Sequence, residues 1–345
     1  MSRCGVSGRL ARCAGEQGEL VAGFLAHGEG GCEDSKASGW IGFAFLKNGL
    51  NMVTVDSWRG WCDSVFWADD GPRGSMEFGA GDVVFCKIDE VMRFFERVRL
   101  TRGRVVLVTG QGDFPCDGWR QGFLPANVAH WFATNVTQPH PRITALPLGL
   151  GSPFSLTTLT AEAIWEARRD AWPRDRWLYV NFRPDTNPAV RGPVFEFFQH
   201  RPEDWVSFES PVERGKNGRF LDQILRHRFV LCPPGNGVDT HRMWEALVAG
   251  AIPVVLRSQA MKPFESLPVL FVEDYREVTI ELLEAAWAKV KTPEEVPVMM
   301  HEDFWAAQIL KEKNGLKGRE TMPLLEWIRE SVRYGLGMVA RRVGK

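Results

Sequence analysis

The chain has 345 residues, and 44% of them are hydrophobic, which is enough for one large or two ordinary domains with real cores. The formal net charge is −1, so the surface as a whole has no electrostatic reason to bind nucleic acid or an anionic membrane. Local basic clusters remain possible. Apolar runs fall short of the roughly 18 residues of a membrane span, and residues 1–35 hold no apolar stretch of signal-peptide length. We therefore expect no membrane span.

The cysteines predict a reducing compartment. They number seven, an odd count, and none has the Cys-x-x-Cys or Cys/His spacing of a zinc site. Cys86 and Cys232 lie inside apolar runs and are predicted to be buried thiols. Because disulfides are rare in reducing compartments, this cysteine usage favours a cytoplasmic protein.

The N-terminal part of the chain carries weak structural signals. Residues 1–36 are rich in small residues and are predicted to form a flexible N-terminal arm. The runs 40–46 and 51–55 flank Asn48-Gly49, a dipeptide typical of tight turns. They are predicted either as a hairpin or as the first strand of a sheet.

From about residue 80, short apolar runs of strand length alternate with stretches of helical spacing, which is the pattern of an α/β protein. The predicted strands are 82–87, 104–109, 131–136 and 143–148. The predicted helices are 88–100, 124–131 and 159–172. This part predicts a first α/β domain at 37–172.

The pattern restarts after Pro173-Arg174-Asp175-Arg176, which is a plausible boundary. The predicted strands are 177–182, 205–208, 229–232, 252–256 and 269–272. The predicted helices are 189–200, 219–226, a helix capped by Asp239 or Thr240 and ended by Gly250, and 279–291. A second α/β domain is thus predicted at 173–300, followed by C-terminal helices at 301–345.

Two successive α/β units predict two mostly parallel sheets that face a cleft. Ligands of open α/β sheets bind beyond the carboxyl ends of the strands. This rule selects the loops 110–118, 137–142, 149–154, 181–191, 207–214 and 233–242.

The loop 233–242 has the features of an anion site. Gly235 and Gly237 let the backbone approach a ligand closely, and the loop leads into a helix N-terminus with free N–H groups. Arg242 in the first helical turn can bind a phosphate through two N–H groups. We predict a diphosphate-binding turn whose other members are Asn236, Asp239 and His241.

Glu245 lies on the same helical face as His241 and Arg242. A carboxylate one turn behind a diphosphate site can accept hydrogen bonds from both ribose hydroxyls. The alternative is that Glu245 simply pairs with Arg242 or His241.

The loop 181–188 offers further donor-binding candidates, beginning with Asn181. Arg183 and Arg191 bring positive charge to the strand end, where they can neutralise a leaving diphosphate in place of a metal ion. The alternative is a solvated loop in which Thr186 or Asn187 caps the next helix.

The run Phe229-Val-Leu-Cys-Pro-Pro-Gly-Asn-Gly through Ala249-Gly-Ala-Ile-Pro-Val-Val resembles the signature region of exostosin-like glycosyltransferases. In that family a Pro-Gly loop, an Arg, an acidic residue before Ala-Leu and an Ala-Gly-x-Ile-Pro-Val ending recur. Trp177-Leu-Tyr-Val-Asn-Phe, Thr186-Asn187-Pro188 and Arg191 resemble the start of the family's donor domain. The resemblance is specific over residues 177–255.

The resemblance implies a GT-B fold, with two Rossmann-like domains, the acceptor side at 37–172 and the nucleotide-sugar side at 173–300. It implies inverting, metal-independent transfer of a sugar, by a hexosyl- or pentosyltransferase, from a nucleotide-diphosphate donor to a glycan or carbohydrate hydroxyl. Arg242 matches the phosphate-contacting Arg, and Glu245 matches the ribose-binding acid. The nucleotide sugar is then a co-substrate, and no cofactor or metal is expected.

Inverting transfer to a hydroxyl needs a general base on the acceptor side. The candidates at strand ends are Asp113, Asp117 and His140, and we prefer Asp113 because it directly follows a buried strand. The chain has no Asp-x-Asp, the usual ligand pair of metal-dependent sugar transfer. It also has no Walker loop and no Gly-x-Ser-x-Gly.

Two other classes of protein remain open. A non-catalytic nucleotide-sugar or glycan-binding protein could keep the donor fold and lack the base. A two-domain periplasmic-type binding protein also has two α/β halves, but the missing signal sequence and the helix with Arg242 and Glu245 weigh against it.

Overall fold

A computed structural model of the chain describes residues 51–67, 77–152, 159–169, 173–201, 203–211, 217–289 and 296–343. The predicted arm at 1–36 and the strand candidate at 40–46 lie outside these residues. Everything described belongs to the unit Asn48–Lys345.

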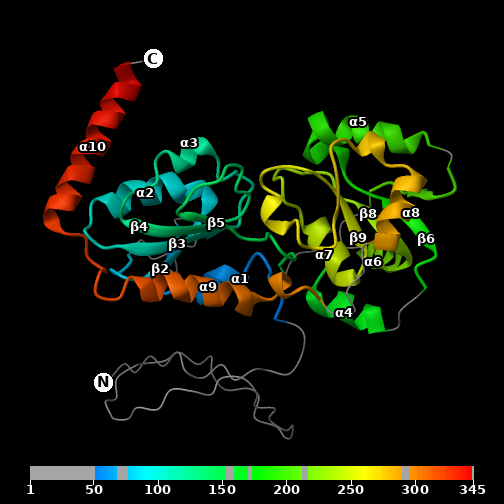
Figure 1. Cartoon of the computed structure of the whole chain (residues 1–345), viewed down its shortest axis with the longest axis horizontal. Helices are drawn as coiled ribbons and strands as arrows, with labels where there is room; N and C mark the ends of the chain where they lie inside the picture. Colours follow the sequence, from blue (N-terminus) through cyan, green and yellow to red (C-terminus); the bar gives the residue numbers. More distant parts are fainter. Residues whose placement is uncertain are drawn as a thin grey trace, which may run out of the picture. The chain divides into compact units, whose positions relative to one another are not determined.

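The first sheet is parallel and has five strands (Figure 1). In spatial order its strands are β1 (Ser64–Phe66), β2 (Val83–Lys87), β3 (Val105–Gly110), β4 (Val128–Ala133) and β5 (Ile143–Ala145). Every residue of β3 is buried, as expected of a central parallel strand. Its smaller elements are α1 (Ser57–Trp61), η2 (Ile88–Glu90), α2 (Val91–Arg99) and α3 (Gly118–Gln121).

Helix α2 forms because its apolar residues recur at helical spacing. Val91, Phe94, Phe95 and Val98 are all buried and belong to one cluster with the sheet residues Val84 and Leu107, among others. The alternate residues of β2 and β3, such as Phe85 and Val108, belong to a different cluster, so both faces of this sheet are covered.

The second sheet is also parallel, with the strand order β10-β9-β8-β6-β7. The strands are β6 (Arg176–Val180), β7 (Val206–Phe208), β8 (His227–Leu231), β9 (Ile252–Leu256) and β10 (Leu270–Val272). Its helices are α4 (Ala161–Arg169), which packs on α6 and α7, η3 (Pro184–Thr186), α5 (Pro188–Gln199), α6 (Asn217–Arg226), α7 (His241–Ala249), η4 (Lys262–Phe264), η5 (Tyr275–Glu277) and α8 (Ile280–Lys289).

The strand order places a topological switch point between β6 and β8. From β6 the chain moves to β7 on one side, and then returns to β8 on the other side. Crevices that bind ligands in open α/β sheets form at such points, because the neighbouring loops diverge to opposite faces of the sheet.

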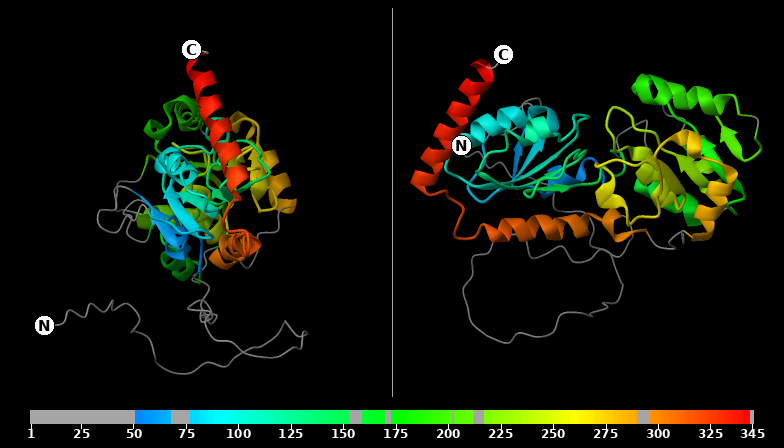
Figure 2. Two further views of the ribbon diagram at one scale, coloured as in Figure 1. Left: turned by 90° about the vertical axis from the view of Figure 1, so that its left-hand side faces the viewer. Right: turned by 45° about the horizontal axis from the view of Figure 1, so that its top comes forward.

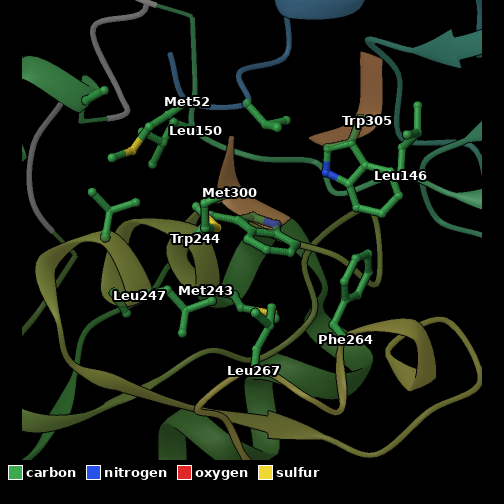
Figure 3. Packing of buried hydrophobic residues seen from close by; sticks show 14 of the residues in the cluster. Met52, Leu146, Leu150, Met243, Trp244, Leu247, Phe264, Leu267, Met300 and Trp305 are labelled. Carbon is green, nitrogen blue, oxygen red and sulfur yellow. The ribbon is translucent and has the colours of Figure 1, made fainter. Parts of the chain in front are cut away.

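The first half of the protein is the sheet β1–β5 with its helices, and the second half is the sheet β6–β10 with its helices. A continuous apolar cluster joins these two halves (Figure 3). Trp244 and Met243 of α7 lie near Met52, Leu146 and Leu150 from the first half of the chain. The same cluster includes Phe264 and Leu267 from the second half and Met300 and Trp305 from the C-terminal segment.

The C-terminal segment returns to the first sheet (Figure 2). It contains η6 (Val298–Met300), α9 (Glu302–Gly315) and α10 (Leu324–Val343). Helix α9 contacts β3 and β4, and α10 is tied to the end of α2 by a hydrogen bond of 3.0 Å from Trp327 Nε1 to Arg99 O. Among the described helices, including the 20-residue α10, none has both the length and the apolar content needed to cross a membrane.

The predicted helix at 124–131 is wrong. Strand β4 begins at Val128, and residues 118–121 form the short helix α3 instead. The β-strand wins because it pairs with β3 and β5 on its two sides, and because Trp131 Nε1 donates to Thr109 Oγ1 at 2.9 Å. Local helical spacing cannot report such long-range pairing.

Residues 51–55 were predicted as a strand and form two isolated bridges, Met52 with His301 and Thr54 with Leu150. The elements α1 and β1 were not predicted. Cys86 and Cys232 are buried free thiols, as predicted, and burial raises the pKa of the Cys232 thiol to about 12.

Candidate functional site

The loops that leave β6 and β8 are held together by Arg191, from the first turn of α5. Its side chain is buried and donates to Pro234 O and Pro233 O, both at 2.9 Å. It also donates to Arg183 O at 3.1 Å and to Thr186 Oγ1 at 2.6 Å. Burial, followed by repulsion from Arg242, lowers the pKa of Arg191 to about 10. The structure thus gives Arg191 a positioning role, and direct contact with a diphosphate stays a prediction.

Gly235 lets this cation come close. A Cβ atom built at Gly235 would lie 3.1 Å from Arg191 Nη2, closer than most real Cβ contacts. Asn187 is the N-cap residue of α5, as predicted, but its side chain makes no cap hydrogen bond, and its Nδ2 donates to Gly235 O at 2.9 Å. The loop 233–235 is therefore held in place by Asn187 and Arg191, which follow β6.

The other candidates of the loop 181–188, Asn181 and Arg183, are hydrogen-bonded to neighbouring residues. Asn181 is buried, and its Nδ2 donates to Ser210 O at 2.9 Å. Arg183 is exposed and binds Asp185 through Nε at 3.2 Å and Nη2 at 2.8 Å. Contact of either residue with a donor remains a prediction.

Arg242 is a cation with buried donor atoms that lack acceptors. Its Nε and Nη1 atoms are inaccessible to solvent and find no hydrogen-bond partner within the described structure. The guanidinium carbon lies 5.1 Å from the centre of the Phe220 ring on α6. Buried donors without acceptors are costly, so a side chain held this way is suited to an anion that enters from outside.

The N-terminus of α7 adds to this candidate anion site. Thr240 is the N-cap residue and makes no side-chain cap hydrogen bond. The first turn of a helix carries partial positive charge, so it attracts the same kind of ligand as Arg242.

Asp239 forms hydrogen bonds with residues of both halves of the protein. It is buried, and its Oδ2 accepts from Leu148 N at 2.7 Å, while its Oδ1 accepts from Trp244 Nε1 at 2.7 Å. Burial raises the pKa of Asp239 to about 7, although these hydrogen bonds act in the opposite direction. Its carboxylate positions α7.

Asn135 adds a further hydrogen bond between the two halves. It was not identified as a site residue from the sequence. It follows β4 with a left-handed φ of 53°, and its Oδ1 accepts from Asp239 N at 2.9 Å. A Cβ atom at Gly237 would lie 2.9 Å from Asn135 Nδ2, so the nearest neighbour of this glycine is Asn135. In the sequence the local signal is an Asn near the end of a strand, because Asn adopts left-handed backbone more readily than most residues.

His241 also connects the halves. Its Nδ1 lies 2.8 Å from Gly149 O, an acceptor that fixes the proton on Nδ1. Gly149 has φ 71°, and a Cβ atom there would lie 2.3 Å from Val53 O, so only glycine fits. The first turn of α7 is thus held by the predicted loop 149–154.

Glu245 is buried, and its Oε1 accepts from Leu159 N at 2.8 Å. Burial raises its pKa. The carboxylate therefore binds a backbone amide just before α4, and the ribose role stays a prediction.

Asp113 and Asn236 meet across the two halves. Asn236 Nδ2 donates to Asp113 Oδ2 at 3.1 Å, and both residues are exposed. Of the other base candidates, Asp117 caps α3 through Arg120 N and also binds Arg120 Nη1, while His140 Nδ1 accepts from Arg142 N. Of the three candidates, Asp113 is therefore the one hydrogen-bonded to the loop 233–242, which we call the donor loop.

A pocket of about 510 Å³ lies elsewhere, between α10 and residues 122–127, and none of the candidate residues lines it. Within the described ranges, no three His, Cys, Asp or Glu side chains are grouped to hold a metal ion.

The family model of the exostosin GT47 domain matches residues 109–296, more than half of the chain. The predicted family resemblance is therefore confirmed, and the predicted span 177–255 lies inside the match. Together with two parallel five-stranded sheets, the match also confirms the predicted α/β, GT-B-like fold. A search among curated proteins gave no match.

Solved structures with partly similar backbones are distant in sequence. An α1,3-fucosyltransferase is 12% identical, with a TM-score of 0.43, over 75% of this chain and 89% of its own. AviGT4, a glycosyltransferase involved in avilamycin A biosynthesis, is 14% identical, with a TM-score of 0.37, over 70% and 86%. UDP-GlcNAc 2-epimerase from Methanocaldococcus jannaschii is 10% identical, with a TM-score of 0.33, over 66% and 76%. These TM-scores lie below 0.5, so the likenesses carry no argument about activity.

The raised pKa of Asp239 predicts a pH dependence of stability. Between the ordinary value of 3.8 and about 7, the folded state keeps a proton that the unfolded state has lost. The free energy of unfolding should therefore fall as pH rises through this window. Asp239→Asn cannot titrate, so the difference in stability between wild type and variant should shrink with rising pH, as measured by urea unfolding.

Asp185→Asn is the control, because the exposed pairing with Arg183 lowers the pKa of Asp185 below this window. A difference between wild type and Asp239→Asn that stays constant with pH would show that Asp239 does not titrate there.

Proposed function

The chain belongs to the exostosin GT47 family, and we propose that this glycosyltransferase moves a hexose or pentose from a nucleotide-diphosphate sugar to a glycan or carbohydrate hydroxyl. The observation that carries the choice of donor is Arg242, whose buried Nε and Nη1 donors lack acceptors at the N-terminus of α7. A diphosphate supplies the acceptors and the negative charge that this position lacks.

The leaving group in this transfer is the nucleoside diphosphate. As the bond from the anomeric carbon to the diphosphate breaks, negative charge grows on the phosphate oxygens. Arg242 and the first-turn amides of α7 would stabilise that charge. Because Asp239 and His241 fix this turn to the other half of the molecule, the donor groups are ordered before the reaction.

The acceptor hydroxyl needs a base on the opposite side of the sugar, and we assign that role to Asp113. Support comes from its position, since its carboxylate lies 3.1 Å from Asn236 Nδ2 of the donor loop. Attack from that side with Asp113 taking the hydroxyl proton gives inversion, as the family resemblance implies.

We also propose that transfer needs no metal ion, because Arg242 offers the positive charge that a metal would otherwise supply. A cytoplasmic location is proposed on the four described cysteines, Cys62, Cys86, Cys116 and Cys232, which are free thiols.

Replacing Arg242 should have opposite effects on ligand binding and on stability. Arg242→Met removes the charge and keeps an apolar stem against Phe220. We expect binding of UDP, GDP or dTDP, whichever binds the wild type, to weaken by about 1.5–3 kcal/mol, the worth of a charge-assisted hydrogen bond. The ligand-free variant should unfold at an equal or higher temperature, because a costly buried donor is gone.

Calorimetric titration and thermal unfolding measure these two effects. Arg176→Met is the control, since Arg176 lies at the opposite, amino end of β6. Unchanged nucleotide affinity in Arg242→Met, or a loss of stability without ligand, would assign Arg242 a structural role.

Asp113→Asn tests the base and also separates an enzyme from a binding protein. The amide oxygen can still accept from Asn236, so donor affinity should hold. The rate of transfer should fall about 10²- to 10⁴-fold, the usual contribution of a general base. Asp117→Asn, which keeps the capping ability of the residue, is the comparison.

Full transfer by Asp113→Asn and loss in Asp117→Asn would move the base to Asp117. Donor binding without transfer in the wild type would favour the non-catalytic alternative.

Chelation tests the proposed absence of a metal. Transfer should proceed at the same rate after dialysis against EDTA, measured as release of nucleoside diphosphate in the presence of acceptor. A rate that falls with EDTA and returns with added Mg²⁺ or Mn²⁺ would reject the metal-independent mechanism.

A further inference from the structure

Helix α10 presents two different faces, and one of them is bound to the first half of the protein. On that face Trp327 Nε1 donates to Arg99 O, and Glu326 pairs with Arg104 at 2.8 Å. The guanidinium carbon of Arg99 lies 3.8 Å from the centre of the Tyr334 ring. These contacts fix the rotation of the helix about its axis.

The opposite face carries a stripe of exposed apolar side chains. Leu325 is 79% exposed, Ile328 43%, Val332 55% and Leu336 67%. Their spacings of three, four and four residues place them along one side of the helix. Single exposed apolar residues are ordinary, whereas an aligned group indicates an interaction surface.

Positive charge borders this stripe. Arg329 and Arg333 each follow a stripe residue, Ile328 and Val332, and both arginines are exposed. The acidic residues of α10 are Glu326, which belongs to the bound face, and Glu330, which lies 3.8 Å from Arg333 and also faces Arg142. The stripe itself contains no acidic residue.

We propose that the exposed stripe of α10 docks this protein on a membrane surface that contains anionic lipids. The helix would lie in the plane of the interface, with Leu325, Ile328, Val332 and Leu336 among the acyl chains and the arginines at the headgroups. Its 20 residues span about 30 Å, which is ample for a surface helix.

The charges favour lipid over a second copy of the chain. Two α10 helices packed stripe to stripe would bring Arg329 and Arg333 of one copy close to the same residues of the other. Like charges brought together in this way oppose association, while anionic headgroups attract them. Because the net charge is only −1, the protein as a whole is neither strongly repelled by an anionic membrane nor attracted to it. The attraction must therefore come from the local arginines.

Co-sedimentation of the full chain with vesicles tests the proposal. We expect binding to vesicles of equal parts phosphatidylcholine and phosphatidylserine, and much weaker binding to phosphatidylcholine alone. Replacing both Arg329 and Arg333 by Gln should weaken binding about thirtyfold, since each basic residue near an anionic surface contributes about fivefold. Leu325→Ser with Val332→Ser should abolish it.

Val298→Ser is the matched control, because Val298 is 63% exposed, close to the 55% of Val332, and lies outside α10. Its binding should equal that of the wild type. The substituted side chains on α10 are exposed, so thermal unfolding of the variants should match the wild type.

Three results would overturn the proposal. The first is no binding to either vesicle. The second is binding that the α10 variants leave unchanged. The third is a wild-type dimer, seen by light scattering, that the double serine variant dissociates, since a second copy would then cover the stripe.

Discussion

The buried carboxylate of Asp239 is the contact on which the arrangement of the site depends. It accepts from the backbone of Leu148 in the first half and from Trp244 Nε1 in α7, the helix that follows it. Its own amide is held by Asn135 at the end of β4. These bonds set where α7 begins and how it is rotated. Arg242 lies three residues further on, so the position of the side chain proposed to bind the diphosphate is decided by residues that follow strands of the other sheet.

Several features near α7 lower stability. Arg191 and Arg242 are two cations near one another, and burial already lowers the pKa of Arg191. Asn135 keeps a left-handed backbone, and Asp239 keeps a carboxylate in a dry setting. Such costs persist where a site must be ordered before its ligand arrives. Burial of the apolar cluster around Trp244, which joins both halves, opposes these costs.

Arg191 shows what the fold adds to a residue singled out by its place in the sequence. Its position beside the donor loop was predicted from the strand–loop–helix pattern. Its guanidinium donates to four protein acceptors and so shapes the loop 233–235, whereas two buried donors of Arg242 find no acceptor in the described structure. Spacing along a chain locates a charge, but only the fold shows which acceptors reach it first.

The sequence by itself determined the family and most of the alternation of strands and helices. Those follow from local signals: apolar runs such as 105–110, the breaks at Pro233, Pro234 and Gly235, and the left-handed Gly250 that ends α7. Tertiary structure alone decided that 128–133 is a strand, that Asn135 holds Asp239, and that Asn236 meets Asp113. These contacts join residues about 100 or more positions apart, or depend on pairing with two neighbouring strands, and no local propensity encodes such pairing.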